Sequence, residues 1–308
     1  MATDTSKYKL RVKDPVESVK FYELLGMKVI NKIENPQWSF DLYFLAFDSD
    51  KAESPGRHWT DREGIVELTH NYGTESNPEY TICNGNDEPH RDIAISVDNL
   101  QGACDRLEQA NVAFKKKLSE GRMRHIAFAK DPNGYWVEII GLKDQITTET
   151  DTSSYRMNHS MIRVKSATAS LKFYQETMGM TLLRTLKNPD SKFDLYFLGY
   201  KREGEVENAS ATSDREGLLE LTYNYGTDDP DSDFTGYHDG NAEPQGFGHI
   251  CVSVDDLDAA CARFEEQNVD WKKRLTDGKM RNVAFVKDPD GYWIEILQNE
   301  GLKKRADW

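Results

Sequence analysis

The stretch RVKDPVESVKFYELLGM, which begins at Arg11, returns later in the chain as RVKSATASLKFYQETMGM, beginning at Arg163. In the same order, EGIVELTHNYGT at Glu63 returns as EGLLELTYNYGT at Glu216. An internal repeat of this length indicates that one structural unit occurs twice in the chain. The sequence therefore predicts two tandem copies of one unit, which differ by small insertions in loops.

A polar segment separates the two copies. The sequence QITTETDTSS, residues 145–154, has no apolar periodicity and is rich in Thr and Ser, as linkers are. We therefore expect a first repeat over residues 1–144, a linker over 145–154 and a second repeat over 155–300.

Each copy divides again into two similar modules. In DNLQGACDRLEQAN, residues 98–111, the apolar residues Leu100, Ala103, Cys104 and Leu107 follow helical spacing. Segments such as IVELTH (65–70) and DIAISV (92–97) are typical of strands. The predicted fold is α+β, with four βαβββ modules in two tandem repeats. Such a module has one open sheet face, and pairing two modules closes a cleft suited to a small ligand.

Composition excludes several classes of protein. The formal charge of −14 over 308 residues leaves no basic patch for nucleic acid. No apolar run approaches the roughly 18 residues of a membrane span, and the first residues lack the pattern of a signal peptide. The four cysteines show no CxxC spacing. We expect a soluble cytoplasmic protein without a disulfide framework, binding neither nucleic acid nor membrane.

Carboxylates interrupt the apolar strands at matching places. In YWIEIL the two-residue period of a strand puts Glu295 on the face of Trp293 and Leu297, and in LLELTY the carboxylate is Glu220. A lone buried carboxylate is costly unless a cation, a metal or a proton compensates it. Active sites use compensation of that kind, so these glutamates are candidate functional residues.

Two histidines occupy comparable places in the second copy. They are His159 in MNHSMIRV and His249 in GFGHICVSV. Two imidazoles and two carboxylates form a mixed nitrogen and oxygen ligand set for zinc, nickel, cobalt or iron. Taken singly, each histidine is more typical of a half-buried structural residue than of a metal ligand. The recurrence at module starts and ends favours a metal site.

The motifs GFGHICVSV, ELTYNYGT, DPDGYWIEIL and MNHSMIRVK closely resemble those of glyoxalase I in its two-domain fungal or plant form. The resemblance covers nearly the whole chain. It implies a vicinal-oxygen-chelate fold and conversion of the methylglyoxal–glutathione hemithioacetal into S-lactoylglutathione. It also implies one divalent metal ion, with zinc first and nickel or cobalt as alternatives, and glutathione as part of the substrate. By the same resemblance we expect a monomer that contains an internal pseudo-dimer.

Position by position, the resemblance gives roles to individual residues. It makes His159, Glu220, His249 and Glu295 metal ligands, with Glu295 the leading candidate for the proton-transferring base. A base of this type takes a proton from carbon and returns it to the neighbouring carbon. The substrate-binding positions are Arg163, Asn224, Lys273 and Met280, with Arg11 and Asn71 as their counterparts in the first copy.

The first copy departs from this pattern. It keeps Glu67 and Glu138 at the carboxylate positions, with Glu138 as the corresponding catalytic candidate, but both histidines are lost. Lys7 stands opposite His159, and Asp92 stands opposite His249. A lysine is a poor metal ligand that could neutralise Glu67, whereas Asp92 could coordinate a hard ion.

The consequence depends on which modules pair. Pairing across the copies would make one site from Glu67, His249 and Glu295, and another from the remaining four positions: Asp92, Glu138, His159 and Glu220. Pairing within a copy would leave one complete site in the second repeat and a dead one in the first. The resemblance to fused two-domain proteins favours pairing across copies. We expect about one tightly bound divalent ion per chain and allow for a weaker second one. Two equally tight ions would imply that Asp92 or a nearby residue such as His90 restores the first-copy ligands.

Two other functions fit the same motifs. A catalytically weak protein could keep the cleft and hold glutathione conjugates without turnover, and the loss of two histidines favours this alternative. An extradiol dioxygenase shares the fold and uses two histidines and one glutamate on iron. The ELT(H/Y)NYG motif and Arg163 argue against the dioxygenase, because they match glutathione-type sites.

Overall fold

A computed structural model describes residues 2–83, 91–121, 123–209 and 211–302. The described chain forms four modules, each a strand, a helix and three further strands. Module 1 comprises β1 (Ala2–Val12), α1 (Pro15–Leu24), β2 (Lys28–Asn35), β3 (Phe40–Ala46) and β4 (Ile65–Asn71). Module 2 comprises β5 (Asp92–Val97), α2 (Leu100–Gln109), β6 (Phe114–Lys116), β7 (Ile126–Lys130) and β8 (Trp136–Gly141).

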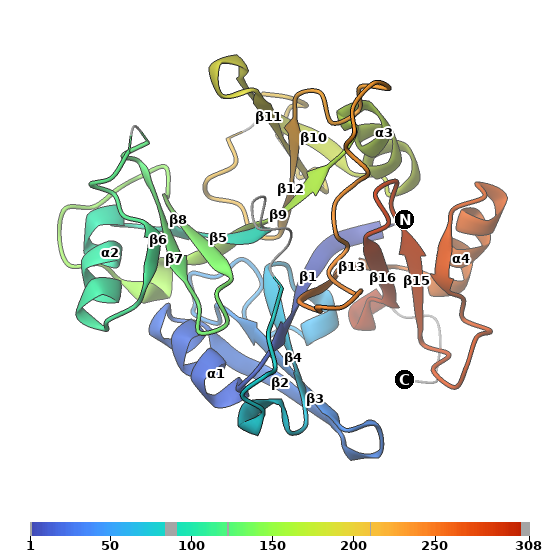
Figure 1. The fold of residues 1–308 in the computed structure, drawn as a ribbon, viewed down its shortest axis with the longest axis horizontal. Helices are drawn as coiled ribbons and strands as arrows, with labels where there is room; N and C mark the ends of the chain where they lie inside the picture. The colour runs from blue at the N-terminus through green and yellow to red at the C-terminus, as the bar shows by residue number, and fades with distance from the viewer. Residues whose placement is uncertain (1, 84–90, 122, 210, 303–308) are drawn as a thin grey trace.

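The second repeat follows the same plan. Module 3 comprises β9 (Arg156–Val164), α3 (Ala167–Lys172), β10 (Thr181–Asn188), β11 (Phe193–Gly199) and β12 (Leu218–Asn224). Module 4 comprises β13 (Phe247–Val254), α4 (Leu257–Glu266), β14 (Trp271–Lys273), β15 (Val283–Lys287) and β16 (Trp293–Gln298). Figure 1 shows the four modules around a common centre, from blue through green and yellow to red. The predicted α+β fold of four βαβββ modules is confirmed.

The helices begin where the sequence supplies caps. Asp14 accepts hydrogen bonds from the backbone N–H groups of Val16 and Glu17 at the start of α1, and Asn99 and Asp256 cap α2 and α4 in the same way. Helix α3 continues into a π-helical turn over Phe173–Thr177. The second copy is one residue longer here than the first, and a π turn accommodates one extra residue without breaking the helix.

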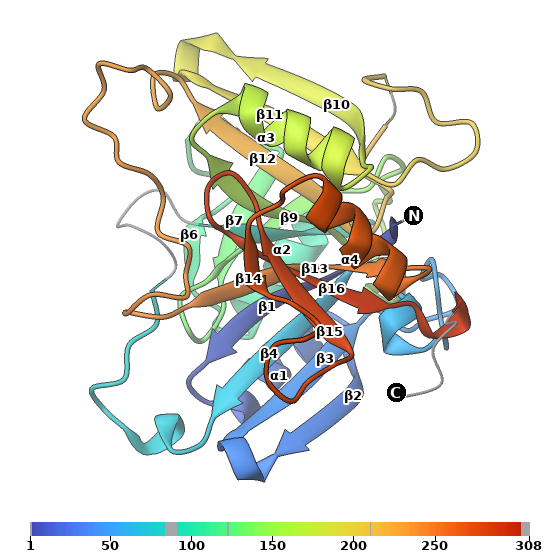
Figure 2. The same cartoon turned by 90° about the vertical axis from the view of Figure 1, so that its right-hand side faces the viewer.

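The strands form two eight-stranded sheets, and each sheet contains both repeats. One sheet has the order β14-β15-β16-β13-β1-β4-β3-β2, and the other has the order β10-β11-β12-β9-β5-β8-β7-β6. Antiparallel pairs β1–β13 and β5–β9 join the repeats. Module 1 therefore pairs with module 4, and module 2 pairs with module 3. Figure 2 shows β1 and β13 running through the middle, with α3 and α4 on the near side.

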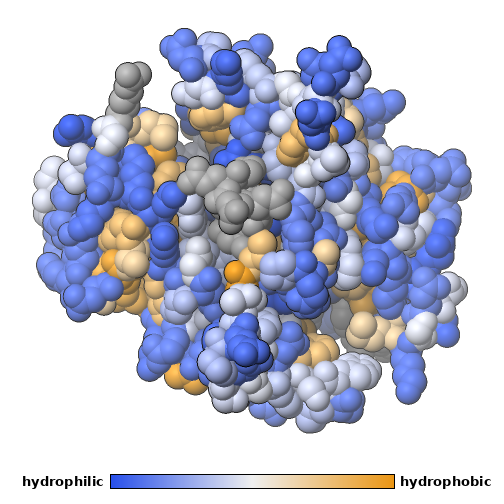
Figure 3. Space-filling view, viewed as in Figure 1, coloured by the Kyte–Doolittle hydropathy of each residue, from blue (hydrophilic) through white to orange (hydrophobic). Residues whose placement is uncertain are grey.

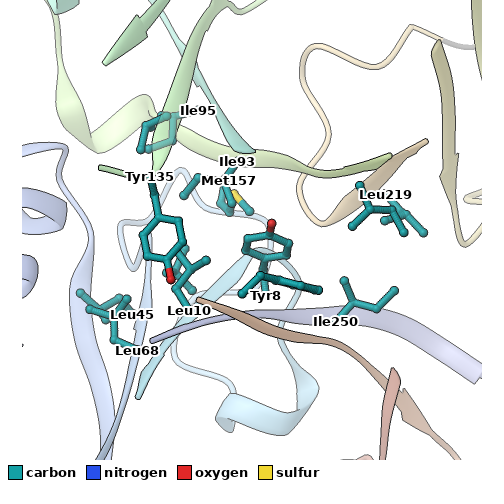
Figure 4. Close-up of a cluster of buried hydrophobic side chains, with 14 of the residues drawn as sticks. Tyr8, Leu10, Leu45, Leu68, Ile93, Ile95, Tyr135, Met157, Leu219 and Ile250 are labelled. Atoms are coloured by element: carbon teal, nitrogen blue, oxygen red, sulfur yellow. The ribbon is translucent and has the colours of Figure 1, made fainter. Parts of the chain in front are cut away.

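The hydrophobic core lies where the two sheets meet. In Figure 4, Tyr8 lies near Met157 and Ile93, which come from the other sheet and from both repeats. All three are buried, and Tyr8 stacks on Phe247 with 4.8 Å between ring centroids. The two repeats share one continuous core.

The polar segment between the repeats lies against the second module. The Gln145 side chain donates to the carbonyl of Val97 at 2.7 Å, and the Thr150 hydroxyl donates to Asp98 at 2.7 Å. The face shown in Figure 3 is mostly hydrophilic, with scattered apolar areas. In the described ranges, no helix is long and apolar enough to cross a membrane.

The shared core predicts that the chain unfolds in a single step. Ile250→Ala should lower the free energy of unfolding by about 2–5 kcal/mol, because Ile250 is fully buried and its loss leaves a cavity. Urea unfolding followed by circular dichroism and by tryptophan fluorescence should give one coincident transition, shifted to lower urea. The exposed Val206 provides the control, since Val206→Ala should change little. Two separate transitions, of which only one moves, would contradict a shared core.

Candidate metal and substrate site

Four titratable side chains from four adjacent strands meet on the sheet of modules 2 and 3. We call them the acidic cluster: Asp92 on β5, Glu138 on β8, His159 on β9 and Glu220 on β12. His159 Nε2 lies 3.1 Å from a Glu220 oxygen and 3.3 Å from a Glu138 oxygen. Ligand atoms of Asp92, Glu138 and His159 all lie within 4.8 Å of one another. The central position of β9 and β5 in the sheet brings these chains together.

The neighbouring Asn158 fixes the orientation of His159. Its side-chain amide donates to the carbonyls of Thr212 and Arg215 at 2.7 and 2.8 Å, so its oxygen must face the imidazole. That oxygen lies 2.8 Å from His159 Nδ1. Nδ1 therefore carries a hydrogen, and in the neutral ring the lone pair is on Nε2. Proteins orient a metal-binding imidazole through a hydrogen bond of this kind to the ring nitrogen that does not bind the metal.

The negative charge of the carboxylates in the acidic cluster favours the binding of a cation. Burial, together with the charges of Glu138 and Glu220, raises the pKa of Asp92 well above its usual range. Burial would lower the pKa of His159, but the charges of Glu220 and Glu138 outweigh it and raise the pKa to about 10. His159 Nε2 is buried and has no partner in hydrogen-bond geometry. Three carboxylates around an imidazole with an orphaned nitrogen fit a divalent ion.

The acidic cluster opens into two cavities. A cavity of about 460 Å³ is lined by Glu138, His159 and Glu220 together with apolar side chains such as Leu195 and Phe197. A second cavity of about 210 Å³ is lined by Asp92 and Arg163, and it reaches Glu138 and Glu220 as well. The carboxylates thus lie between a mostly apolar space and one with a guanidinium in its wall.

Two of the expected substrate-binding residues lie beside each other at this site. The guanidinium of Arg163 donates to the side-chain oxygen of Asn224 at 3.2 Å. Asn224 in turn donates to the hydroxyl of Tyr237 at 3.0 Å. The strand period that placed Arg163 on the His159 face agrees with its position in the wall of the smaller cavity.

The other expected ligand positions meet on the sheet of modules 1 and 4. We call them the lysine cluster: Lys7 on β1, Glu67 on β4, His249 on β13 and Glu295 on β16. Lys7 Nζ lies 2.7 Å from Glu295 and donates to Glu67 at 3.0 Å. His249 Nε2 lies 3.4 Å from Glu295. The four positions of the second repeat are thus split between two sites.

A lysine changes the charge balance of this cluster. Burial would raise the pKa of Glu295, but the charges of Lys7 and His249 outweigh it and hold the pKa well below its usual range. The acidic cluster contains no such ammonium. Glu67, His249 and Glu295 lie close enough to share an ion, but Lys7 is among them.

The remaining substrate-binding candidates lie on the lysine-cluster sheet. Arg11 donates to the carbonyl of Phe247 at 3.1 Å and to the side chain of Asn241 at 3.0 Å, while Asn71 ends β4. Lys273 donates to the carbonyl of Met280 at 2.6 Å, and both belong to module 4. The structure therefore does not bring Lys273 and Met280 to Arg163. His90 lies outside the described residues.

Sequence reasoning missed the corresponding residues of module 2. Lys116 donates to the carbonyl of Met123 at 2.5 Å and to that of Ile126 at 2.8 Å, as Lys273 does in module 4. Met123 lines both cavities of the acidic cluster. The signal was present in the repeat, because LSEGRMR in the first copy matches LTDGKMR in the second.

Comparisons with known proteins agree with this architecture. Residues 6–139 and 156–296 each match the family model "Glyoxalase/Bleomycin resistance protein/Dioxygenase superfamily". The chain is 44% identical to a lactoylglutathione lyase of Schizosaccharomyces pombe, over 97% of this chain and 99% of that protein. It is 46% identical to glyoxalase I of Saccharomyces cerevisiae, over 94% of this chain and 90% of that protein.

Solved structures give the same result. The crystal structure of glyoxalase I from Zea mays superposes with a TM-score of 0.69 at 26% identity, and the match covers 96% of this chain and 92% of that one. A match over 96% of this chain spans both repeats. This chain therefore belongs to the two-domain glyoxalase I, or lactoylglutathione lyase, family.

Proposed function

We propose that the acidic cluster is the catalytic metal centre of this lactoylglutathione lyase. The observation that carries the proposal is the contrast in charge between the clusters. Two buried carboxylates, Asp92 and Glu220, and the half-buried Glu138 surround His159 with no lysine among them, and they open on two cavities. The substrate that we propose is the hemithioacetal of methylglyoxal and glutathione.

A divalent ion would be held by Asp92, Glu138, His159 and Glu220. Such an ion would act as a Lewis acid and would stabilise the negative charge that develops on the substrate when a carbon-bound proton leaves. We propose zinc, with nickel or cobalt as alternatives, because one imidazole with several carboxylates suits these ions. The Thr222 hydroxyl donates to Glu220 at 2.9 Å and so supports a ligand role for Glu220.

Glu138 is the proposed general base. It takes the proton from one carbon of the substrate and returns it to the neighbouring carbon, so that the hemithioacetal becomes a thioester with no net gain or loss of protons. Its counterpart Glu295 was the leading candidate from the sequence. An ammonium 2.7 Å from Glu295 favours Glu138 instead, because a carboxylate held by a close cation is a weaker base.

The two cavities suggest how the substrate lies. A glutathione carboxylate pairs with the guanidinium of Arg163 in the smaller cavity, since Arg binds carboxylates through charge-assisted hydrogen bonds. The side chain of the 2-oxoaldehyde then occupies the larger cavity, where Leu195 and Phe197 exclude water. We propose that the protein acts as a monomer in the cytosol, where its four cysteines would stay reduced.

A first prediction separates the two histidines. His159→Ala should remove both bound metal and activity, because it deletes the only imidazole of the acidic cluster. His249→Ala should keep one ion per chain and most of the activity. Metal analysis after dialysis, with an assay of hemithioacetal consumption on the same samples, measures both. If His249→Ala were the variant that lost its metal, the lysine cluster would be the metal centre. Metal binding without turnover in the wild type would favour a binding protein.

A second prediction compares the two candidate bases. Glu138→Gln should lower kcat by about 10²–10⁴-fold, the usual contribution of a general base, while keeping the side-chain volume. Glu295→Gln should leave kcat within a few-fold of the wild type. Circular dichroism on both variants controls for folding. A larger loss of kcat in Glu295→Gln would contradict the assignment.

A third prediction tests glutathione recognition. Arg163→Ala should raise KM with little change in kcat, because an interaction made equally in the ground and transition states affects binding alone. Arg11→Ala serves as the matched variant. It should leave KM unchanged and lower the melting temperature, since Arg11 bonds to the chain at Asn241 and Phe247. An unchanged KM in Arg163→Ala would argue for a smaller substrate.

A further inference from the structure

The lysine cluster occupies the position that the acidic cluster occupies in the other sheet. In the parallel pair β1–β4, Lys7 is opposite Ile65, and in the parallel pair β9–β12, His159 is opposite Leu218. Because Ile65 and Leu218 hold the same place in the repeated EG(I/L)(V/L)EL motif, Lys7 takes the place of His159. An imidazole that could bind an ion is thus replaced by a side chain that carries a positive charge itself.

The ammonium of Lys7 lies where the ligands converge. The side chains of Lys7 and Glu67 are each 2% exposed. The Nζ of Lys7 lies 3.0 Å from Glu67 and 2.7 Å from Glu295. Lys9 adds a second positive charge, 3.9 Å from the other oxygen of Glu67. Two glutamates thus face two lysines, and the negative charge that would attract a divalent ion is already compensated.

Aromatic side chains enclose the ammonium. Lys7 Nζ lies 4.8 Å from the ring centroid of Trp59 and 5.1 Å from that of Phe44, within the range of cation–π interactions. The two rings stack on each other, with centroids 4.5 Å apart. In the second repeat the counterparts of Trp59 and Phe44 are Thr212 and Phe197, and both line the large cavity.

Residues 300 and 301 contact the turn that carries Trp59. Trp59 begins a short helical turn that runs to Asp61. Asp61 accepts hydrogen bonds from the backbone N–H groups of Glu300 and Gly301 at 2.6 and 2.8 Å. Its counterpart Asp214 accepts instead from the backbone of Lys143 at 2.8 Å. The turn that carries Trp59 is thus held by contacts that differ from those of the other repeat.

We propose that the lysine cluster is a metal-free site in which the ammonium of Lys7 permanently occupies the cation position. Glu67 and Glu295 occupy ligand positions but serve as the anionic partners of Lys7, and His249 lies beside Glu295. The chain then holds one divalent ion, in the acidic cluster, and one lysine in place of a second ion. This inference concerns the second cluster and stands whichever substrate the acidic cluster takes.

Counting cobalt ions tests the proposal. The metal-stripped full-length protein is titrated with Co²⁺, and bound metal is measured after equilibrium dialysis. The wild type should bind one ion per chain and Lys7→His two, because the substitution removes the ammonium and supplies the missing imidazole. Trp59→Thr is the matched control and should still bind one ion, since it opens space but keeps Lys7. A wild type that binds two ions, or a folded Lys7→His that binds one, would overturn the proposal.

A second background keeps the test independent of the acidic cluster. In His159→Ala the wild-type lysine cluster should bind no Co²⁺, and adding Lys7→His should restore one ion. Thermal unfolding provides a second readout, because an ion that binds only the folded state raises the melting temperature. Co²⁺ should raise the melting temperature of the double variant and leave that of His159→Ala unchanged. If Co²⁺ raised the melting temperature of the single variant His159→Ala, an ion would bind in the lysine cluster and the inference would be refuted.

Discussion

The antiparallel pairing of β1 with β13 and of β5 with β9 is the constraint on which the rest of the structure depends. These two pairs join strands from different repeats, so neither sheet can form from one repeat. Each cluster consequently draws two residues from each copy of the sequence. Lys7, which corresponds to His159, lies in the lysine cluster. Asp92, which corresponds to His249, lies in the acidic cluster. The asymmetry between the clusters follows from these two differences.

Much of the fold could be predicted because the repeat is written in local patterns. The period of the helix around Cys104 and the alternation around Glu67 each depend on a few neighbouring residues, and both appear where expected. The pairing of modules could not be derived from such patterns. The same local patterns fit either pairing, and the two are distinguished by the cross-repeat strand pairs and by contacts such as that of Tyr8 with Phe247.

The site was partly predictable for the same reason. Arg163 and Asn224 come from two adjacent strands of one module, so strand period and register were enough to place them together. Lys273 and Met280 were placed with them by resemblance, yet they belong to module 4, and the module that faces Arg163 supplies Met123. The role of Asn158 could not be predicted, because no sequence pattern indicates what an asparagine within a strand bonds to. Its importance arises from three carbonyls that converge on its amide.

The two clusters also show that a retained carboxylate is weak evidence for a metal. A buried glutamate requires a positive partner for stability, and an ion or an ammonium meets that requirement equally well. Removing one partner of a buried pair is strongly unfavourable, so once Lys7 is present Glu67 and Glu295 are held by the stability of the fold itself. In the acidic cluster no lysine plays that part, and burial together with the charges of Glu138 and Glu220 raises the pKa of Asp92. A metal centre is therefore distinguished from a metal-free cluster less by the ligand residues present than by whether a lysine already neutralises its carboxylates.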